Sequence, residues 1–234
     1  MSTTGNKHLF IYYKDMKIEI SDEIRSICPN FIGAMLTATI TNTEYDAELW
    51  EEIREEEARI RTHNLDYIRE ISSIQNTRAA YKALGKDPSR YRPAAESLIR
   101  RVLKNQELYQ INTAVDLINL ASMVTGYSIG GFDADKIIGD ATLGVGRADE
   151  PYEGIGRGIL NIEGLPVYRD RIGGFGTPTS DHERTKLGLD TRHTTVLING
   201  YDGNRSGVQA CAEMIANLFV KYTKTTDYEI KFYD

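Results

Sequence analysis

The sequence has few cysteines and no long apolar run. Cys28 and Cys211 are the two cysteines among 234 residues, and because they lie far apart with neither in a CxxC pair, we expect reduced thiols and no cysteine-based zinc site. No apolar stretch approaches the ~20 residues of a membrane span, and MSTTGNKHLF lacks the basic region and apolar core of a secretory signal. These absences predict a cytoplasmic protein.

Signatures of metal, nucleotide and serine chemistry are also missing. The four histidines, His8, His63, His182 and His193, show no HxxxH or HExxH spacing, so no metal site of the helical kind is expected. There is no GxSxG or Walker sequence, and GVGRADEPYEGIG does not run from a strand into a helix as a dinucleotide site requires. We therefore expect no metal and no cofactor.

The chain also lacks an excess of positive charge. Its formal net charge is −6, which excludes a protein that coats nucleic acid by charge alone, so any RNA contact must be local. The charges are segregated: residues 44–57 hold eight acids and one base, which is typical of a solvated helix face. Residues 86–107 hold six bases against three acids. One of these bases is Lys86. The other five are our candidate nucleic-acid contacts: Arg90, Arg92, Arg100, Arg101 and Lys104.

The first half of the chain alternates short strands with helices. HLFIYY and MKIEI read as edge strands, Ser21 as the N-cap of a helix that Pro29 stops, and FIGAMLTATIT as a strand of a mixed sheet. Residues 45–62 have an amphipathic helical pattern, and a second helix is expected over 65–85. Pro93 has the first-turn position of the basic helix PAAESLIRRVLK.

INTAVDLINLASMVTG is apolar on nearly all sides, which predicts a buried helix closed by Gly126. Asn112, Asp116 and Asn119 repeat at spacings that put them on one face of this helix. Two interpretations remain open: these side chains cap the helix and satisfy buried hydrogen bonds, or they line a pocket.

From residue 130 to 195, recurrent glycines separate short apolar runs, which predicts short strands and tight turns. HTTVLING then reads as a buried strand, residues 206–222 as an amphipathic helix and DYEIKFY as a last strand. The predicted fold class is therefore α+β, with a helical N-terminal half and a β-rich C-terminal half whose sheet is packed by helix 206–222.

The segment INTAVDLINLASMVTGYSIGGFDADKI resembles the B3/B4 domain, the RNA-handling and editing module of bacterial phenylalanyl-tRNA synthetase β subunits. RYRPAAESLIRRVLK before it and GLPVYRD and GFGTPTSDHERT after it resemble the flanks in free-standing members of the group, so the likeness covers roughly residues 90–200. It implies one B3/B4-like domain over residues 1–234, with residues 1–85 packed against the core. The matching positions are Ile111, Asn112, Val115, Asp116, Asn119, Phe132, Asp133, Asp135, Lys136 and Ile137.

The resemblance implies a module that receives the tRNA acceptor end and hydrolyses tyrosine wrongly attached to phenylalanine tRNA. The sequence departs from the module at three pocket positions. Gly130 and Gly131 stand where the module has His-Ala, Tyr109 stands at the position of an Arg, and Asn199 at that of a Glu that reads the tyrosine hydroxyl. The resemblance therefore supports the fold more strongly than tyrosine editing.

The stretch TPTSDHERT gathers hydrogen-bonding groups after a glycine-rich turn, a density that could grip a small ligand. The alternative is an N-cap at Ser180 or Asp181, with Glu183 and Arg184 on the surface. His182 between two acids has the same two interpretations, general base or exposed loop histidine. The further pocket candidates in this stretch are Thr179 and Thr185.

Two functions of different classes follow. The first is a tRNA-binding module that hydrolyses misacylated aminoacyl-tRNA in trans, an ester hydrolase whose catalytic residues the sequence does not identify. The second is a protein without a reaction, whose inherited pocket binds an amino acid or a similar small metabolite. Neither involves a membrane, and the oligomeric state stays open.

Overall fold

The computed structural model describes residues 15–234 as an α+β fold. In chain order the elements are β1 (Ile18–Ile20), α2 (Asp22–Ile27), β2 (Ile32–Thr39), α3 (Ala47–Arg61), α4 (Tyr67–Glu70), α5 (Ser72–Ala83), α6 (Ala94–Leu103), α7 (Thr113–Thr125), β3 (Ser128–Asp133), the 3-10 helix η1 (Ala134–Lys136), β4 (Ala141–Val145), β5 (Glu153–Gly154), β6 (Gly158–Ile159), β7 (Pro166–Arg169), β8 (Gly174–Gly176), the 3-10 helix η2 (Glu183–Thr185), β9 (His193–Gly200), α8 (Arg205–Tyr222) and β10 (Tyr228–Tyr233).

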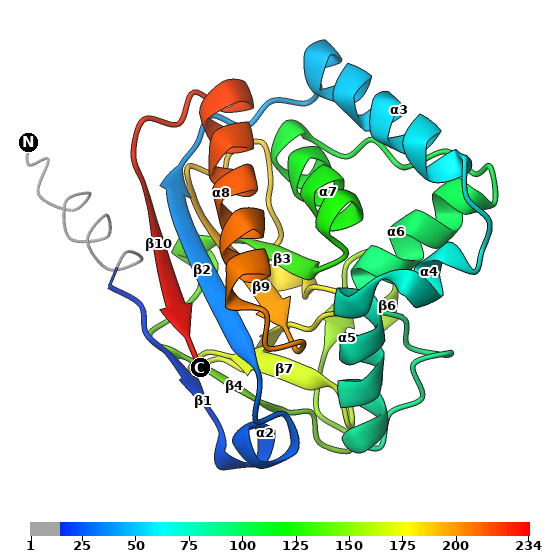
Figure 1. The fold of residues 1–234 in the computed structure, drawn as a ribbon. Helices are drawn as coiled ribbons and strands as arrows, with labels where there is room; N and C mark the ends of the chain where they lie inside the picture. Colours follow the sequence, from blue (N-terminus) through cyan, green and yellow to red (C-terminus); the bar gives the residue numbers. More distant parts are fainter. Residues whose placement is uncertain (1–14) are drawn as a thin grey trace, which may run out of the picture.

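An antiparallel sheet with strand order β10-β2-β9-β3 forms the centre of the fold (Figure 1). Its strands alternate between two faces, so Leu36 on β2 and its partner Val196 on β9 point to the same side. Helices α7 and α8 cover this side, and the apolar side chains between them and the sheet form the larger core. The amphipathic pattern of residues 206–222 is therefore explained by burial against this sheet.

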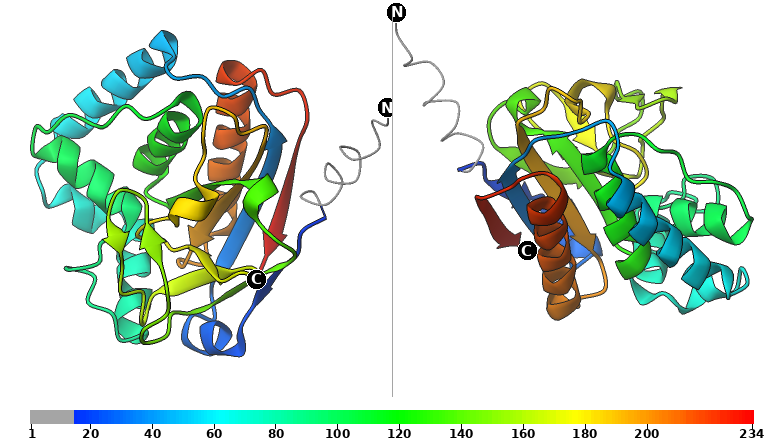
Figure 2. Two further views of the ribbon diagram at one scale, coloured as in Figure 1. Left: turned by 180° about the vertical axis from the view of Figure 1, so that it is seen from behind. Right: turned by 90° about the horizontal axis from the view of Figure 1, so that it is seen from above.

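A second sheet, β1-β4-β7-β8, packs against the other face of the first. Leu197 and Phe132 from the first sheet meet Tyr168 and Phe175 from the second, with the rings of Phe132 and Phe175 edge to face at 5.0 Å. Both faces of the central sheet are thus buried. Figure 2 shows the antiparallel sheet between the helices and the second sheet.

Helices α3 to α6 lie on the side of α7 away from α8 (Figures 1 and 2). α7 contacts α3, α6, α8 and β3, as expected for a buried helix. Its predicted ends are confirmed: Asn112 is the N-cap and Gly126, with φ of 73°, is the C-cap. The Ser21 N-cap of α2 is confirmed as well.

Three expectations need correction. Residues 65–85 do not form one helix, because Ile71 has extended backbone (ψ of 103°) and divides α4 from α5. The break lets α5 begin against the end of α7, where the Ser73 hydroxyl donates to the Thr125 carbonyl at 3.0 Å. β2 pairs only in antiparallel fashion and not in a mixed sheet, and Pro93 precedes α6 by one residue. The strand predicted in HLFIYY lies outside the described residues.

The β-rich half does not build its sheets alone. Each four-stranded sheet contains one strand from the first part of the chain, β2 in the antiparallel sheet and β1 in the other. β1 pairs with β4 in parallel, with Ile18 opposite Ala141. The N-terminal strands are therefore integral to the core.

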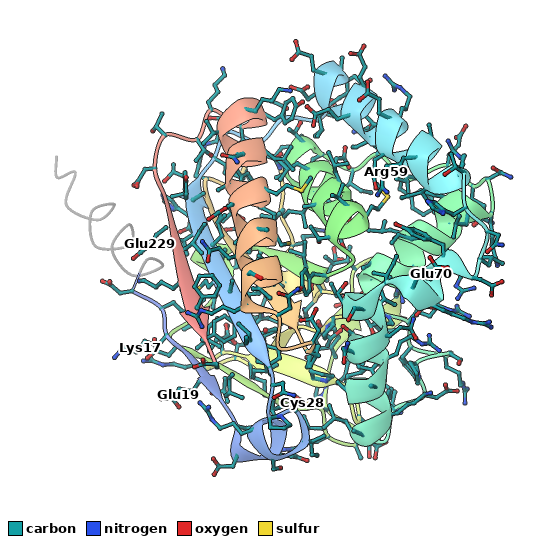
Figure 3. The ribbon with its side chains drawn as sticks, viewed as in Figure 1. Lys17, Glu19, Cys28, Arg59, Glu70 and Glu229 are labelled. Carbon is teal, nitrogen blue, oxygen red and sulfur yellow. The ribbon has the colours of Figure 1, made fainter. Side chains whose placement is uncertain are left out.

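Both cysteines are free thiols, with Cys211 buried in α8 and Cys28 half-buried just after α2, as labelled in Figure 3. Burial raises the pKa of each thiol. This agrees with the expected reduced cysteines. Among the helices of residues 15–234, none combines the length and apolarity needed to cross a membrane.

Gly146, just after β4, is a position where the backbone tolerates no side chain. Its N–H donates to Leu165 O at 2.8 Å, and a Cβ there would lie 1.9 Å from the carbonyl oxygen of Ile162. We expect Gly146→Ala to lower the free energy of unfolding by about 1–3 kcal/mol in urea denaturation, because the clash is with backbone that cannot rotate away. Gly144→Ala on the same strand is the control, since its Cβ would meet only the Arg169 and Ser21 side chains. Equal effects of the two substitutions would refute this close approach.

Candidate functional site

The carboxyl group of Asp181 lies beside two glycines, Gly130 in strand β3 and Gly176 in strand β8. A Cβ built on Gly130 would be 3.1 Å from Asp181 Oδ1, and one on Gly176 in β8 would be 3.6 Å from it. β3 is an edge strand, which leaves the Gly131 N–H free to donate to the Asp181 carboxylate. Two of the predicted pocket positions, Gly130 and Gly131, are thus brought together with Asp181.

The surroundings of Asp181 make it a group that titrates near neutral pH. Burial, partly offset by the hydrogen bond from Gly131, raises the pKa of Asp181 to about 8. No lysine or arginine in the described residues forms an ion pair with Asp181. The ring of Phe132 lies beside Gly130 and Gly176, the two glycines that Asp181 also approaches. The residue nevertheless remains partly exposed. A carboxyl group with such a pKa suits proton transfer.

The loop that leads to Asp181 is held by hydroxyl groups. Thr177 Oγ1 accepts from the backbone N–H of Thr179 and Ser180, at 3.2 and 3.0 Å, and donates to Ser180 O. Tyr152 OH donates to the same carbonyl at 2.8 Å, and Thr179 Oγ1 pairs with Tyr81 OH at 2.9 Å. These threonines therefore fix the loop. The Ser180 hydroxyl, partly exposed, has no hydrogen-bond partner among residues 15–234.

The predicted N-cap at Ser180 or Asp181 is wrong. The short helix η2 is capped by His182, whose Nδ1 accepts from the Arg184 N–H at 2.9 Å. Burial lowers the pKa of His182, and the nearby Arg184 lowers it further. Because its Nδ1 is engaged in the cap, His182 has a structural role that the sequence pattern did not indicate.

Arg184 and Glu183 do not take part in the site at Asp181. The Arg184 guanidinium binds both oxygens of Asp170 at 3.0 Å, and also the Lys136 carbonyl at 2.7 Å. Because Asp170 is fully buried, Arg184 is a structural ion pair and not the surface residue of the alternative interpretation. Glu183 is bonded to Lys186 in an exposed pair. Thr185 is buried and donates toward the Phe175 carbonyl.

Asn112 and Asp116 follow the capping interpretation. Asn112 Oδ1 accepts from the Val115 N–H at 3.0 Å, and its amide donates to Leu187 O. Asp116 accepts from Trp50 Nε1 at 2.9 Å and from the Ile111 N–H at 3.0 Å. Neither forms a hydrogen bond with Asp181, and both bond within the part of the fold around α7.

Asn199 lies in the layer between the two sheets. Its Oδ1 accepts from Tyr168 OH at 2.9 Å, its amide donates to Ser128 O, and Tyr168 OH also pairs with Tyr233 OH at 2.8 Å. Both polar ends of this buried side chain are thus satisfied by the protein. The position that resembled a substrate-reading glutamate holds the two sheets together here.

Tyr109 lies apart from these groups, in the exposed loop between α6 and α7. Its ring is 68% exposed and the Arg101 guanidinium stands 4.0 Å from its centre. This stacked pair adjoins the basic helix and contributes to a different surface from Asp181.

A buried acid, Glu96, binds some of the bases of the basic cluster and leaves others unpaired, which the sequence pattern did not indicate. Glu96 on α6 is fully buried and accepts from Arg100 at 2.8 Å and from Arg78 on α5 at 2.7 Å, with Arg92 at 3.8 Å. Lys86 is also buried and donates to Asn161 O at 2.9 Å. Arg100 and Lys86 therefore serve the fold. Among the six bases of residues 86–107, the exposed ones without an ion pair to the described residues are Arg90 and Lys104.

A surface hollow of about 270 Å³ connects this basic region with the loop of Thr177 and Thr179. Its remaining wall comes from the β5–β6 hairpin and the residues after it. Sequence patterns missed this hollow, because its parts come from three separate segments. The residues that line the hollow are Arg90, Tyr91, Arg157, Leu160, Asn161, Leu165, Thr177 and Thr179.

Metal binding has no support in the described chain, where no three histidine, cysteine or acidic side chains are grouped to hold an ion. This finding covers residues 15–234 only. The chemistry available at Asp181 is accordingly that of a carboxyl group, a hydroxyl group and backbone N–H donors.

Comparison with known proteins gives one family and one structure to report. The family model described as "B3/4 domain" matches residues 76–224. An N-terminal fragment of the phenylalanyl-tRNA synthetase β-subunit from Pyrococcus horikoshii has a TM-score of 0.47 and 13% sequence identity, with 92% of this chain and 50% of the fragment covered. The chain thus spans about half the length of that fragment. No curated protein matches the sequence.

The raised pKa of Asp181 predicts a pH-dependent stability. Between its ordinary value near 4 and about 8, the folded state holds a proton that the unfolded state releases, so stability should fall as pH rises through this window. Asp181→Asn, which remains neutral, should therefore be more stable than the wild type at pH 8.5, and this advantage should shrink toward pH 4.5. Urea denaturation at several pH values measures it. A pH-independent difference between the two proteins would contradict the assignment.

Proposed function

The chain belongs to the B3/4 domain family, and from this premise we propose that it is a tRNA-binding module that hydrolyses misacylated aminoacyl-tRNA in trans. The family match covers residues 76–224, which include β3, the Asp181 loop and the basic helix α6. The observation that carries the proposal is the Asp181 carboxyl, held against Gly130 and Gly131 with its pKa raised to about 8.

The absence of a side chain at Gly130 makes room for the carboxyl group of Asp181. The editing module that the sequence resembles has His-Ala where this chain has Gly130 and Gly131, and a side chain at Gly130 would meet Asp181 Oδ1 and the Phe132 ring. The glycine therefore leaves the space that the carboxyl group occupies. We propose that Asp181 supplies, from a different segment, a proton acceptor at this place in the fold.

In the proposed reaction Asp181 acts as general base. Its carboxylate takes a proton from a water molecule while the water oxygen bonds to the ester carbonyl carbon. The bond from that carbon to the ribose oxygen then breaks, and Asp181 returns the proton to the ribose oxygen, releasing the amino acid and the free tRNA end. In this proposal the Ser180 hydroxyl, adjacent in sequence to Asp181 and without a hydrogen-bond partner in the described residues, would orient the water or the ester.

Deacylation of a panel of mischarged tRNAs tests this reaction, beginning with tyrosine on phenylalanine tRNA. Asp181→Asn should lower kcat by about 10²- to 10⁴-fold, the usual contribution of a positioned acid or base. The wild-type rate should rise with pH and level off above about 8, because the base must be ionised. Glu183→Gln is the matched control, since this neighbouring acid is bonded to Lys186.

Full activity of Asp181→Asn would remove Asp181 from the mechanism. A second candidate is binding of an amino acid without a reaction, because Asn199 stands where the editing module reads the tyrosine hydroxyl and its polar atoms are bonded to Tyr168 and Ser128 instead. It would be supported if no mischarged tRNA is hydrolysed while one of the twenty amino acids raises the melting temperature, as a ligand of the folded state must.

The RNA surface is tested separately by the salt dependence of tRNA binding. We expect the affinity to fall steeply with salt, and Arg92→Gln with Lys104→Gln to lower the slope of log Kd against log salt by about 1.4–1.8, since each lost phosphate contact removes roughly 0.7–0.9. Lys17→Gln is the control, because Figure 3 places Lys17 at β1, across the molecule from α6. Absence of tRNA binding at low salt would exclude the RNA role.

A further inference from the structure

The hollow between the α5–α6 loop and the β5–β6 hairpin has the features of an anion site. Figure 1 shows β6 beside α5 and α6. The hollow has a volume of about 270 Å³ and is formed by the loop between α5 and α6, by the β5–β6 turn with the residues after the hairpin, and by the loop after β8. It is lined by Arg90 and Tyr91 on one side, by Arg157 on the other, and by Thr177 and Thr179. Its volume lies just below the range of about 300–1,000 Å³ for drug-sized ligands, which suits a small group.

Two guanidinium groups at this hollow lack acidic partners. Neither Arg90 nor Arg157 forms an ion pair or a side-chain hydrogen bond with the described residues, and both are exposed. Arg78 and Arg100 on the neighbouring helices show the contrast, because Glu96 holds both. Two uncompensated guanidinium groups facing one hollow create a local positive potential in a chain whose net charge is −6.

A third cation, Lys86, lies close to Arg90 and Tyr91 of the hollow. Lys86 is buried, with Nζ bonded to Asn161 O and 3.8 Å from the centre of the Tyr91 ring. Burial lowers the pKa of Lys86, the Glu163 carboxylate opposes this shift, and the positive charge of Arg90 adds to it. Arg90 is thus close enough to Lys86 to repel it, although the Glu163 carboxylate has the larger influence on Lys86 and offsets part of this positive charge.

The threonine wall of the hollow is rigid. Thr177 Oγ1 is engaged with Thr179 and Ser180, and Thr179 Oγ1 pairs with Tyr81 OH in the core. Because Tyr81 is fully buried, this wall is anchored to the interior. The arginines therefore face a preformed surface, which lowers the entropy lost when a ligand binds.

We propose that this hollow binds the phosphate group of a phosphomonoester, either of a free nucleotide or of an RNA terminus. A phosphomonoester carries nearly two negative charges at neutral pH, which matches two guanidinium groups, and each guanidinium can donate two parallel hydrogen bonds to phosphate oxygens. The site does not use Asp181, so it stands independently of the proposed hydrolysis.

Isothermal titration at low salt tests the proposal with inorganic phosphate, AMP, and a short single-stranded RNA with and without a 5′-phosphate. We expect phosphate and AMP to bind, and Arg90→Gln or Arg157→Gln to weaken AMP binding by about tenfold or more, as for loss of a hydrogen bond between charged groups. Arg171→Gln, which changes an exposed arginine in a different loop, should bind AMP as the wild type does. Thermal melts check that each variant is folded. Because Arg90 and Arg157 are exposed, we expect their substitution to leave the melting temperature nearly unchanged.

The probes also distinguish the two sources of the phosphate. Tighter binding of the phosphorylated RNA than of its unphosphorylated twin, lost in the arginine variants, assigns the site to an RNA terminus, whereas AMP binding without this preference assigns it to a free nucleotide. Failure of every phosphate probe to bind, or equal AMP affinity in the wild type and both arginine variants, overturns the proposal. Neither result would bear on deacylation at Asp181, which is measured with different variants.

Discussion

Burial of both faces of the antiparallel sheet β10-β2-β9-β3 is the constraint on which the other features depend. α7 and α8 cover one face and the second sheet covers the other, so every inward position of β2, β3 and β9 has to fit a packed neighbour. Apolar side chains satisfy this against the helices. Between the sheets, Asn199 and Tyr168 form a hydrogen-bonded pair, because a buried polar group needs a partner inside the protein.

The double burial also determines where a substrate could approach. A group in the middle of the sheet is inaccessible, whereas β3 at the edge still exposes backbone donors beyond the ladder. Asp181 uses one of them, the Gly131 N–H, and enters space that Gly130 and Gly176 leave open. The same desolvation that shapes the core raises the pKa of this carboxyl group to about 8. Packing and the chemistry of the candidate site therefore have one physical cause.

Charge on the helical side is organised by burial in a similar way. Glu96 is fully buried and therefore requires cations, and it draws in Arg78 and Arg100 from two helices. These arginines are then committed to the fold. Arg90 and Arg157 form no ion pair with Glu96 and line the surface hollow instead, so the two groups of arginines differ in whether a buried acid holds them.

Local patterns predicted most of the helices and strands, because their signals lie within a few residues of each other. The Ser21 cap, the apolar stripe of α8 and the Gly126 end of α7 are all of this kind. The division at Ile71 was missed, because it follows from the contact of Ser73 with the end of α7, fifty-two residues away. The antiparallel pairing of β2 was missed for the same reason.

The sequence by itself determined the α+β class, the buried helix α7 and the candidate status of Gly130, Gly131 and Asp181. Only the tertiary structure decided which candidates meet: it joined Asp181 to the two glycines, buried Asn199, bound Arg184 to Asp170 and brought Arg157 opposite Arg90. The physical reason is that a side chain's pKa, partners and exposure depend on atoms contributed by distant segments. A residue's identity states what chemistry it can perform, and its neighbours in space decide whether that chemistry is available.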